Sequence, residues 1–171
     1  LKEDLLDLID RRKTIRKKRK ESSVPTLTLV GYTSAGKSTL LNALTESEQT
    51  VSTHLFTTLD PLSRSLTLTN NQKVVLSDTV GFINDLPPHL IEAFKATLEE
   101  VVEADLLLHV LDISDLTFYE HYKVVCDILE KLNVGDTPII TILNKIDKLT
   151  DQRWIEKYER DFSESVSISA L

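Results

Sequence analysis

The stretch that decides the fold is Gly31-Tyr32-Thr33-Ser34-Ala35-Gly36-Lys37-Ser38, which Thr39 follows. It matches G-x-x-x-x-G-K-[ST], the phosphate-binding P-loop. The short run of apolar and β-branched residues 26–30 before it predicts a strand, and residues 37–44 predict a helix. Backbone N–H groups in such a loop converge on phosphate oxygens at the helix N-terminus, where the helix dipole favours an anion. We therefore expect residues 31–39 to bind phosphate, with Lys37 on the β and γ phosphates and the Ser38 hydroxyl on Mg²⁺.

Strand and helix patterns alternate outward from this loop. Further strands are predicted at residues 63–69, 73–77, 106–111, 138–143 and 166–168, and further helices at residues 89–102, 117–132 and 152–161. Residues 46–59 have no clear period and predict a long loop, whereas Asn70-Asn71 predicts a hairpin turn. The pattern indicates an α/β protein: a P-loop NTPase-like three-layer sandwich around a mostly parallel six-stranded sheet with one antiparallel strand.

The charge distribution divides the chain of 171 residues into two parts. Residues 1–21 predict a helix with nine basic and five acidic residues, and eight of the ten residues from 11 to 20 are Lys or Arg. Pro25 disfavours continuation of that helix. We expect a basic helical linker at 1–22 and a nucleotide-binding domain at 24–171 that lacks its final helix. The linker is either a solvated or coiled-coil helix, or a helix that contacts RNA phosphates through residues 11–20.

The single cysteine excludes an internal disulfide, and no apolar run is long enough to span a membrane. Cys126 is interpreted as a buried structural thiol. His109 is expected to be a core residue with its hydrogen bonds satisfied, and His121 a position on a helix surface. Asp112 is expected to cap a helix together with Ser114, although the predicted topology places it near the nucleotide.

Two short motifs add chemistry to the P-loop. Asp78-Thr79-Val80-Gly81 ends a predicted strand, where the Asp78 carboxylate can hold Mg²⁺ through its water shell. Gly81 allows its backbone N–H to approach a γ-phosphate closely. Phe56, Thr57 and Thr58 lie in the long loop, where one threonine can complete the Mg²⁺ shell and bind the γ-phosphate only in the triphosphate state. Thr58 is preferred for this role, with Thr57 as the alternative.

A third motif, Asn144-Lys145-Ile146-Asp147, follows a predicted strand and selects the base. The Asp147 carboxylate can accept two hydrogen bonds from the ring N–H and the exocyclic amine of guanine, a donor pair that adenine lacks. Asn144 is expected to tie this loop to the P-loop, and the stem of Lys145 to pack over the base. Ser169-Ala170, after the last strand, fits a backbone contact to the guanine carbonyl. The motifs together predict a GTP- and GDP-binding domain.

These stretches resemble the HflX family of ribosome-associated GTPases. The resemblance rests on residues 31–42, 56–61 and 93–100, and above all on Asp78-Thr79-Val80-Gly81-Phe82-Ile83-Asn84-Asp85-Leu86-Pro87. It implies a GTP-hydrolysing switch in the cytoplasm, or in mitochondria for a eukaryotic protein, with Lys37, Thr58 and Gly81 as catalytic residues. It also implies a monomeric GTP-binding domain, binding of the whole protein to the large ribosomal subunit, and ribosome splitting or rescue. The alternative is a GTPase-gated binding module in ribosome assembly or tRNA modification, in which hydrolysis only resets binding.

Two residues bear on the rate of hydrolysis. Phe82 stands where Ras-like enzymes have a water-orienting glutamine, so we expect slow intrinsic hydrolysis that a partner stimulates. Ser34 stands where the family usually has asparagine, which in related GTPases helps hold a K⁺ ion. This departure makes activation by K⁺ an open question.

Overall fold

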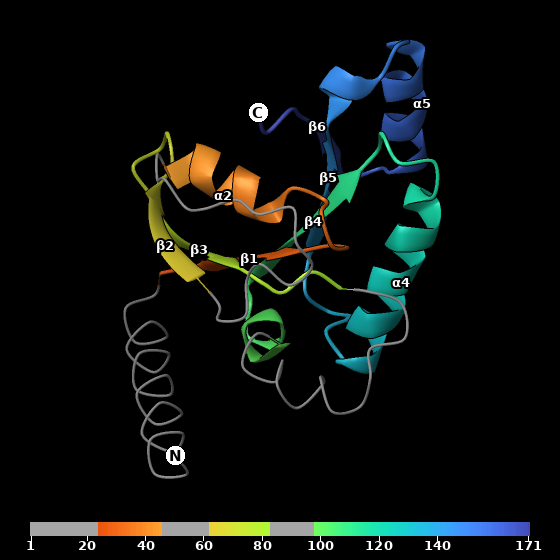
Figure 1. The fold of residues 1–171 in the computed structure, drawn as a ribbon. Coiled ribbons are helices and arrows are strands. Elements are labelled where there is room, and N and C mark those ends of the chain that lie inside the picture. Colours follow the sequence, from red (N-terminus) through yellow and green to blue (C-terminus); the bar gives the residue numbers. More distant parts are fainter. Residues whose placement is uncertain (1–23, 46–61, 83–97) are drawn as a thin grey trace, which may run out of the picture.

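The computed structural model describes residues 24–45, 62–82 and 98–171, which form a single sheet with helices around it (Figure 1). Its strands are β1 (Thr26–Val30), β2 (Leu62–Thr67), β3 (Lys73–Asp78), β4 (Leu106–Asp112), β5 (Ile139–Asn144) and β6 (Ser165–Ser167). Its helices are α2 (Lys37–Thr45), α4 (Phe118–Lys131), α5 (Arg153–Asp161) and the short 3-10 helix η1 (Ile146–Lys148). Residues 98–102 are also helical.

The sheet has the strand order β2-β3-β1-β4-β5-β6. Only β2 runs antiparallel to its neighbour, β3, while β1, β3, β4, β5 and β6 pair in parallel. The predicted fold class, a mostly parallel six-stranded α/β sheet with one antiparallel strand, is therefore confirmed. Parallel neighbours cannot be joined by a hairpin and require crossover connections, usually through helices.

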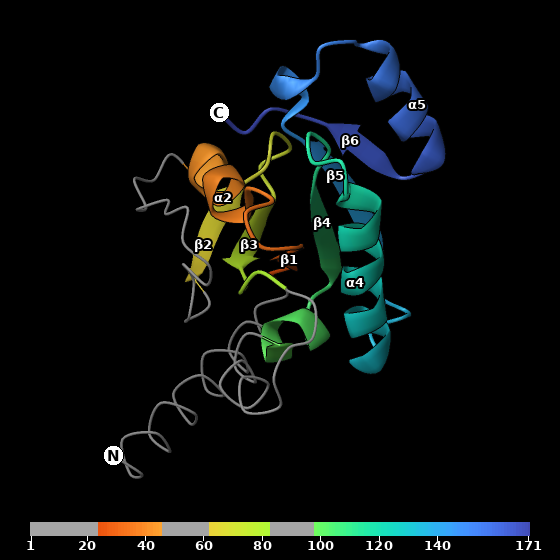
Figure 2. The same ribbon diagram turned by 45° about the vertical axis from the view of Figure 1, so that its right-hand side comes forward.

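The two faces of the sheet bury separate apolar cores, and alternate residues of β4 show the division. Leu108 and Val110 belong to the core on the α2 side, whereas Leu107 belongs to the core on the α4 side. Figure 2 shows α2 and α4 on opposite sides of the strands. A strand covered on both faces is apolar along most of its length, which is why residues 106–111 are apolar except for His109.

The hairpin differs from its prediction at one end. Strand β2 ends at Thr67 rather than residue 69, because the turn is wider than Asn70-Asn71 alone. The N–H of Leu68 donates to the carbonyl of Gln72 at 2.8 Å, and Asn71 adopts a left-handed conformation with φ of 62°. Asparagine tolerates this conformation better than most residues. The predicted turn is therefore present, and it takes two further residues out of the strand.

Several predictions concern residues outside the described part of the chain. These are the basic helix at residues 1–21, the long loop with Phe56, Thr57 and Thr58, and most of the helix expected at 89–102. In the part that is described, no helix has the length and apolar character that crossing a bilayer requires.

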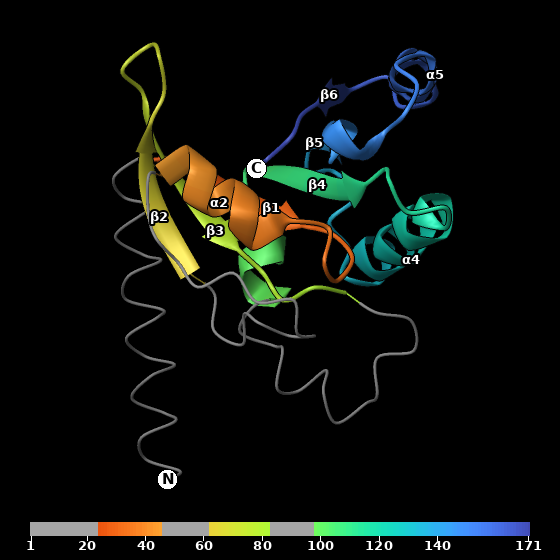
Figure 3. The same cartoon turned by 45° about the horizontal axis from the view of Figure 1, so that its top comes forward.

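The polar motifs gather where the parallel strands end. The P-loop follows β1, Asp78 ends β3, Asp112 ends β4 and Asn144 ends β5. Figure 3 shows the turn between β1 and α2 beside β4. In open α/β sheets, ligands bind outside the carboxyl ends of the strands where the strand order reverses. The fold therefore brings three motifs that are far apart in sequence to one edge of the sheet.

Candidate functional site

The lysine of the P-loop lies inside the loop. Lys37 is only 6% exposed, and its Nζ donates hydrogen bonds to the carbonyls of Gly31 at 3.2 Å and Tyr32 at 3.1 Å. Burial lowers the pKa of Lys37 to about 8, and the nearby Asp78 carboxylate opposes that shift. An ammonium group held in this way by backbone oxygens is already oriented, so an arriving phosphate meets a positioned charge.

Asn144 joins the P-loop to the loop that follows β5. It is 1% exposed, and its Nδ2 donates to the carbonyl of Ala35 at 2.9 Å. Its Oδ1 accepts hydrogen bonds from the backbone N–H groups of Lys145 at 2.8 Å and Ala170 at 3.1 Å. The predicted tie between the two loops is thus seen as a hydrogen bond. Because the N–H of Ala170 is directed at Asn144 here, its contact with a guanine carbonyl stays a prediction.

Gly36 is required where these two loops meet. Its φ is 100°, and a Cβ built on it would lie 2.3 Å from Nδ2 of Asn144. A side chain at this position would therefore be strained and would also displace the asparagine. Two constraints therefore require glycine here: the positive φ of its own backbone and the space that the Asn144 side chain occupies.

The loop after β5 turns sharply to present its polar side chains. Lys145 is left-handed, with φ of 66°, and its Nζ donates to the carbonyl of Ser34 at 2.9 Å. The short helix η1 then exposes Asp147, whose Oδ1 accepts a 2.6 Å hydrogen bond from the Ser169 hydroxyl. Asp147 and Ser169, predicted from separate motifs, are therefore direct neighbours.

The two residues predicted to hold Mg²⁺ within the described chain are in contact. The Ser38 hydroxyl donates to Oδ2 of Asp78 at 2.6 Å. Mg²⁺ prefers hard oxygen ligands and keeps several of its waters, so a hydroxyl beside a buried carboxylate fits this ion. The neighbouring Thr79 and Val80 are buried, and the Thr79 hydroxyl donates to the carbonyl of Leu29. Their side chains anchor the end of β3, and their contact with nucleotide stays a prediction.

The residues after β3 lie directly against the P-loop. The N–H of Thr33 donates to the carbonyl of Phe82 at 3.0 Å, and the N–H of Phe82 donates to the carbonyl of Gly31 at 3.1 Å. A Cβ on Gly81 would lie 2.7 Å from Cα of Thr33, so only glycine permits this approach. The Phe82 side chain is 3% exposed in the core on the α4 side. Gly81 and Phe82 are therefore positioned by the P-loop itself.

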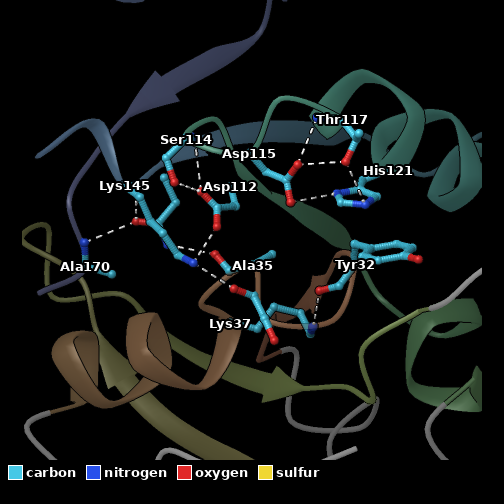
Figure 4. A network of polar contacts seen from close by, with 12 residues as sticks. Tyr32, Ala35, Lys37, Asp112, Ser114, Asp115, Thr117, His121, Lys145 and Ala170 are labelled. Atoms are coloured by element: carbon cyan, nitrogen blue, oxygen red, sulfur yellow. Dashed lines mark hydrogen bonds and ion pairs between the residues drawn. The ribbon is translucent and has the colours of Figure 1, made fainter. Parts of the chain in front are cut away.

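The segment between β4 and α4 contacts both loops, a feature that the motifs did not reveal. Asp112 accepts hydrogen bonds from the N–H and hydroxyl of Ser114 through Oδ1. The predicted pair is present, but it closes the turn before α4 and caps no helix, since the N-cap of α4 is Thr117. Oδ2 of Asp112 pairs with Nζ of Lys145. Farther along, the ring of His121 stacks on the ring of Tyr32, with centroids 3.8 Å apart and planes 10° apart (Figure 4). The only available signal was topological: Asp112 ends β4, and His121 lies in the helix that follows this strand.

The interpretation of His109 needs correction, and that of His121 gains a detail. His109 is buried as expected, but its Nε2 has no hydrogen-bond partner within the described chain, so it is not fully satisfied. Burial, followed by the charge of Lys37, lowers the pKa of His109 to about 3, and the neutral ring stacks on Tyr122. His121 is on a helix surface, but that surface faces the P-loop. Cys126 is half-buried, and burial raises the pKa of its thiol, which agrees with a structural role.

Comparison with known proteins identifies the family. The sequence profile of the family described as "50S ribosome-binding GTPase" matches residues 26–145, which include the P-loop, the D-x-x-G motif and the start of the N-K-x-D motif. The chain belongs to this GTPase family. Within it, the chain groups with HflX: the GTPase HflX of Caldanaerobacter subterraneus is 50% identical over 149 residues, 87% of this chain and 35% of that protein. The predicted HflX resemblance is therefore confirmed.

Solved structures agree with this assignment. A GTP-binding protein from Sulfolobus solfataricus in complex with GDP superposes with a TM-score of 0.67 at 30% identity, covering 98% of this chain and 54% of that chain. Era in complex with MgGDPNP and a segment of 16S ribosomal RNA superposes with a TM-score of 0.66 at 26% identity, covering 86% and 51%. This HflX-family chain spans about a third of the length of the curated relatives it matches.

Proposed function

We propose that this chain is the guanine-nucleotide-binding and GTP-hydrolysing part of an HflX-type switch. The observation that carries the proposal is the convergence of three motifs on one edge of the sheet, where Asn144 binds the carbonyl of Ala35 across 109 residues. A P-loop alone indicates only that phosphate is bound and does not specify the base. With Asp147 fixed by Ser169 at the same edge, the site also has a carboxylate available for the two N–H donors of guanine.

In the proposed reaction, water attacks the γ-phosphorus in line with the β–γ bridge, forming one P–O bond and breaking the other to yield GDP and phosphate. Lys37 and the backbone N–H groups of the P-loop stabilise the charge that develops on the phosphoryl oxygens. Mg²⁺, when bound, neutralises charge on the β and γ phosphates. Ser38 and Asp78 would hold it, together with Thr58, which lies outside the described residues.

The role of a partner follows from Phe82. Its side chain is apolar and buried, so it neither accepts a proton from water nor orients one. Intrinsic hydrolysis is therefore slow, and an external group supplies the missing contribution. The partner proposed is the large ribosomal subunit, which the family description supports. Ribosome splitting or rescue belongs to the whole protein, and the basic residues 11–20 of the linker add salt-dependent contacts to ribosomal RNA.

Base choice is tested by titrating the protein with fluorescent GDP and ADP. We expect GDP to bind at least a hundredfold more tightly, because adenine leaves the Asp147 carboxylate without its two donors. An Asp147→Ala variant should lose most of this preference while keeping its thermal stability, since Asp147 is exposed. Equal affinity for the two nucleotides in the unmodified protein would refute guanine selection.

The partner is tested by single-turnover GTP hydrolysis with and without purified large ribosomal subunits at low salt. Stimulation by large subunits, and none by small subunits at equal concentration, is the expected result. If both leave the rate unchanged, the ribosome-stimulated switch is refuted. If large subunits bind only the GTP form of the protein and leave the rate of hydrolysis unchanged, the alternative is favoured: a nucleotide-gated binding module in which hydrolysis only resets binding.

A further inference from the structure

The P-loop residue Tyr32 is held from outside its own loop. Its ring lies on the ring of His121 from α4, at 3.8 Å between centroids and 10° between planes (Figure 4). Its carbonyl accepts the hydrogen bond from Nζ of Lys37 at 3.1 Å. It also pairs with Phe82 as an isolated parallel bridge. One residue therefore connects α4, the phosphate-binding lysine and the segment that follows β3.

The His121 ring is itself fixed by the turn that precedes α4. Oδ1 of Asp115 accepts hydrogen bonds from the N–H of Thr117 at 2.8 Å and from its hydroxyl at 2.7 Å. The Thr117 hydroxyl has one proton, which goes to Asp115, so at the 3.3 Å contact with Nε2 of His121 it can only accept. Nε2 therefore donates, and Nδ1 faces Oδ2 of Asp115 at 4.0 Å. The hydrogen bond between Nε2 and Thr117 therefore holds one edge of the ring that Tyr32 stacks on, whereas the 4.0 Å separation at Nδ1 is too long for a hydrogen bond.

We propose that His121 is a positioning residue for the P-loop: its ring holds Tyr32, and through Tyr32 the Lys37 ammonium, in the arrangement that binds nucleotide. This inference rests on the proposed function. Aromatic pairs in this arrangement add stabilisation beyond their buried area. Without the ring, the loop is free to leave the competent arrangement, and apparent affinity falls in proportion to the competent fraction. The same β4–α4 segment holds Lys145 through Asp112, so it braces both nucleotide loops.

The test compares three substitutions of His121 in fluorescent-GDP binding. His121→Ala removes the ring, and we expect a dissociation constant roughly three- to tenfold higher, the factor equivalent to one aromatic pair. His121→Phe keeps a ring and should restore affinity to within about twofold. His121→Gln keeps a donor near the position of Nε2 without a ring and should resemble the alanine variant.

Tyr119→Ala is the matched control. Tyr119 is an exposed aromatic residue in the same turn of α4, but its hydroxyl binds Asp161 on the side away from the P-loop. It should lower thermal stability without changing GDP affinity. The positioning role is overturned if His121→Ala binds GDP like the unmodified protein, if Tyr119→Ala weakens binding equally, or if phenylalanine fails to rescue. Failure of the unmodified protein to bind any guanine nucleotide would instead overturn the proposed function and, with it, this role.

Discussion

Asn144→Ala is the substitution that most directly tests how the site is assembled. The change removes three hydrogen bonds: one donated to the carbonyl of Ala35 and two accepted from the N–H groups of Lys145 and Ala170. The side chain is 1% exposed, so water replaces these partners poorly. Each buried group left without a partner costs about 1–3 kcal/mol. Allowing for partial relaxation, we expect the free energy of unfolding to fall by about 3 kcal/mol.

For a chain of this length, that loss corresponds to a melting temperature roughly 6–12 °C lower. Urea unfolding, followed by the fluorescence of Trp154, the only tryptophan, measures the loss in free energy of unfolding. A thermal scan with the same signal measures the melting temperature. Gln152→Ala is the control: Gln152 is exposed and makes no capping hydrogen bond, so its loss should stay within about 0.5 kcal/mol. GDP affinity should fall as well, because the two loops lose their tie. A change in melting temperature for Asn144→Ala no larger than that of the control would refute the reasoning.

Three further predictions concern the P-loop. Gly36→Ala should abolish measurable GDP binding. In a double-mutant cycle, its loss in free energy of unfolding should be smaller when Asn144→Ala is also present, because the 2.3 Å conflict with Nδ2 is then gone. Additive losses would contradict that conflict. GDP affinity, titrated from pH 6.5 to 9, should be flat up to about pH 8 and then weaken by up to about tenfold per pH unit. The ligand-free pKa of Lys37 is about 8 and adjacent phosphate raises it, so binding takes up a proton only above that pH; a flat profile would contradict a neutral lysine. Ser34→Asn should raise thermal stability slightly, because Ser34 is left-handed with φ of 61° and asparagine tolerates this conformation. It should also increase hydrolysis in K⁺ relative to Na⁺, and equal rates in the two salts would remove K⁺ from the mechanism.

Most of the fold could be predicted because local pattern and global arrangement agree. β1 spans the predicted residues 26–30, and β3, β4, β5 and β6 each begin or end within one residue of the prediction. Strands that are covered on both faces, such as β4, have long apolar runs that are hard to mistake. The motifs were likewise predictable, because each is a short string whose geometry is determined within a few residues.

Contacts between side chains from distant elements could not be predicted in the same way. The stack of Tyr32 on His121 depends on the rotation of α4 about its axis, which the apolar pattern defines only to within about a residue. The pairing of Asp112 with Lys145 depends on the left-handed turn at Lys145, a conformation that is uncommon for a residue other than glycine and has no local sequence signal. The same holds for Nε2 of His109, which has no hydrogen-bond partner among the described residues.

The hydrogen bond from Asn144 to Ala35 has a consequence for how the chain acquires its structure. Its partners are 109 residues apart, so the P-loop leaves the ribosome long before the residue that secures it. During synthesis at about 5–20 residues per second, the loop waits at least several seconds for β5. The nucleotide-binding surface is therefore among the last parts to form, and guanine nucleotide can stabilise only the finished domain. For a nascent chain of this kind, cellular GTP and GDP bind and stabilise the chain after it has folded and do not act on the early steps of folding.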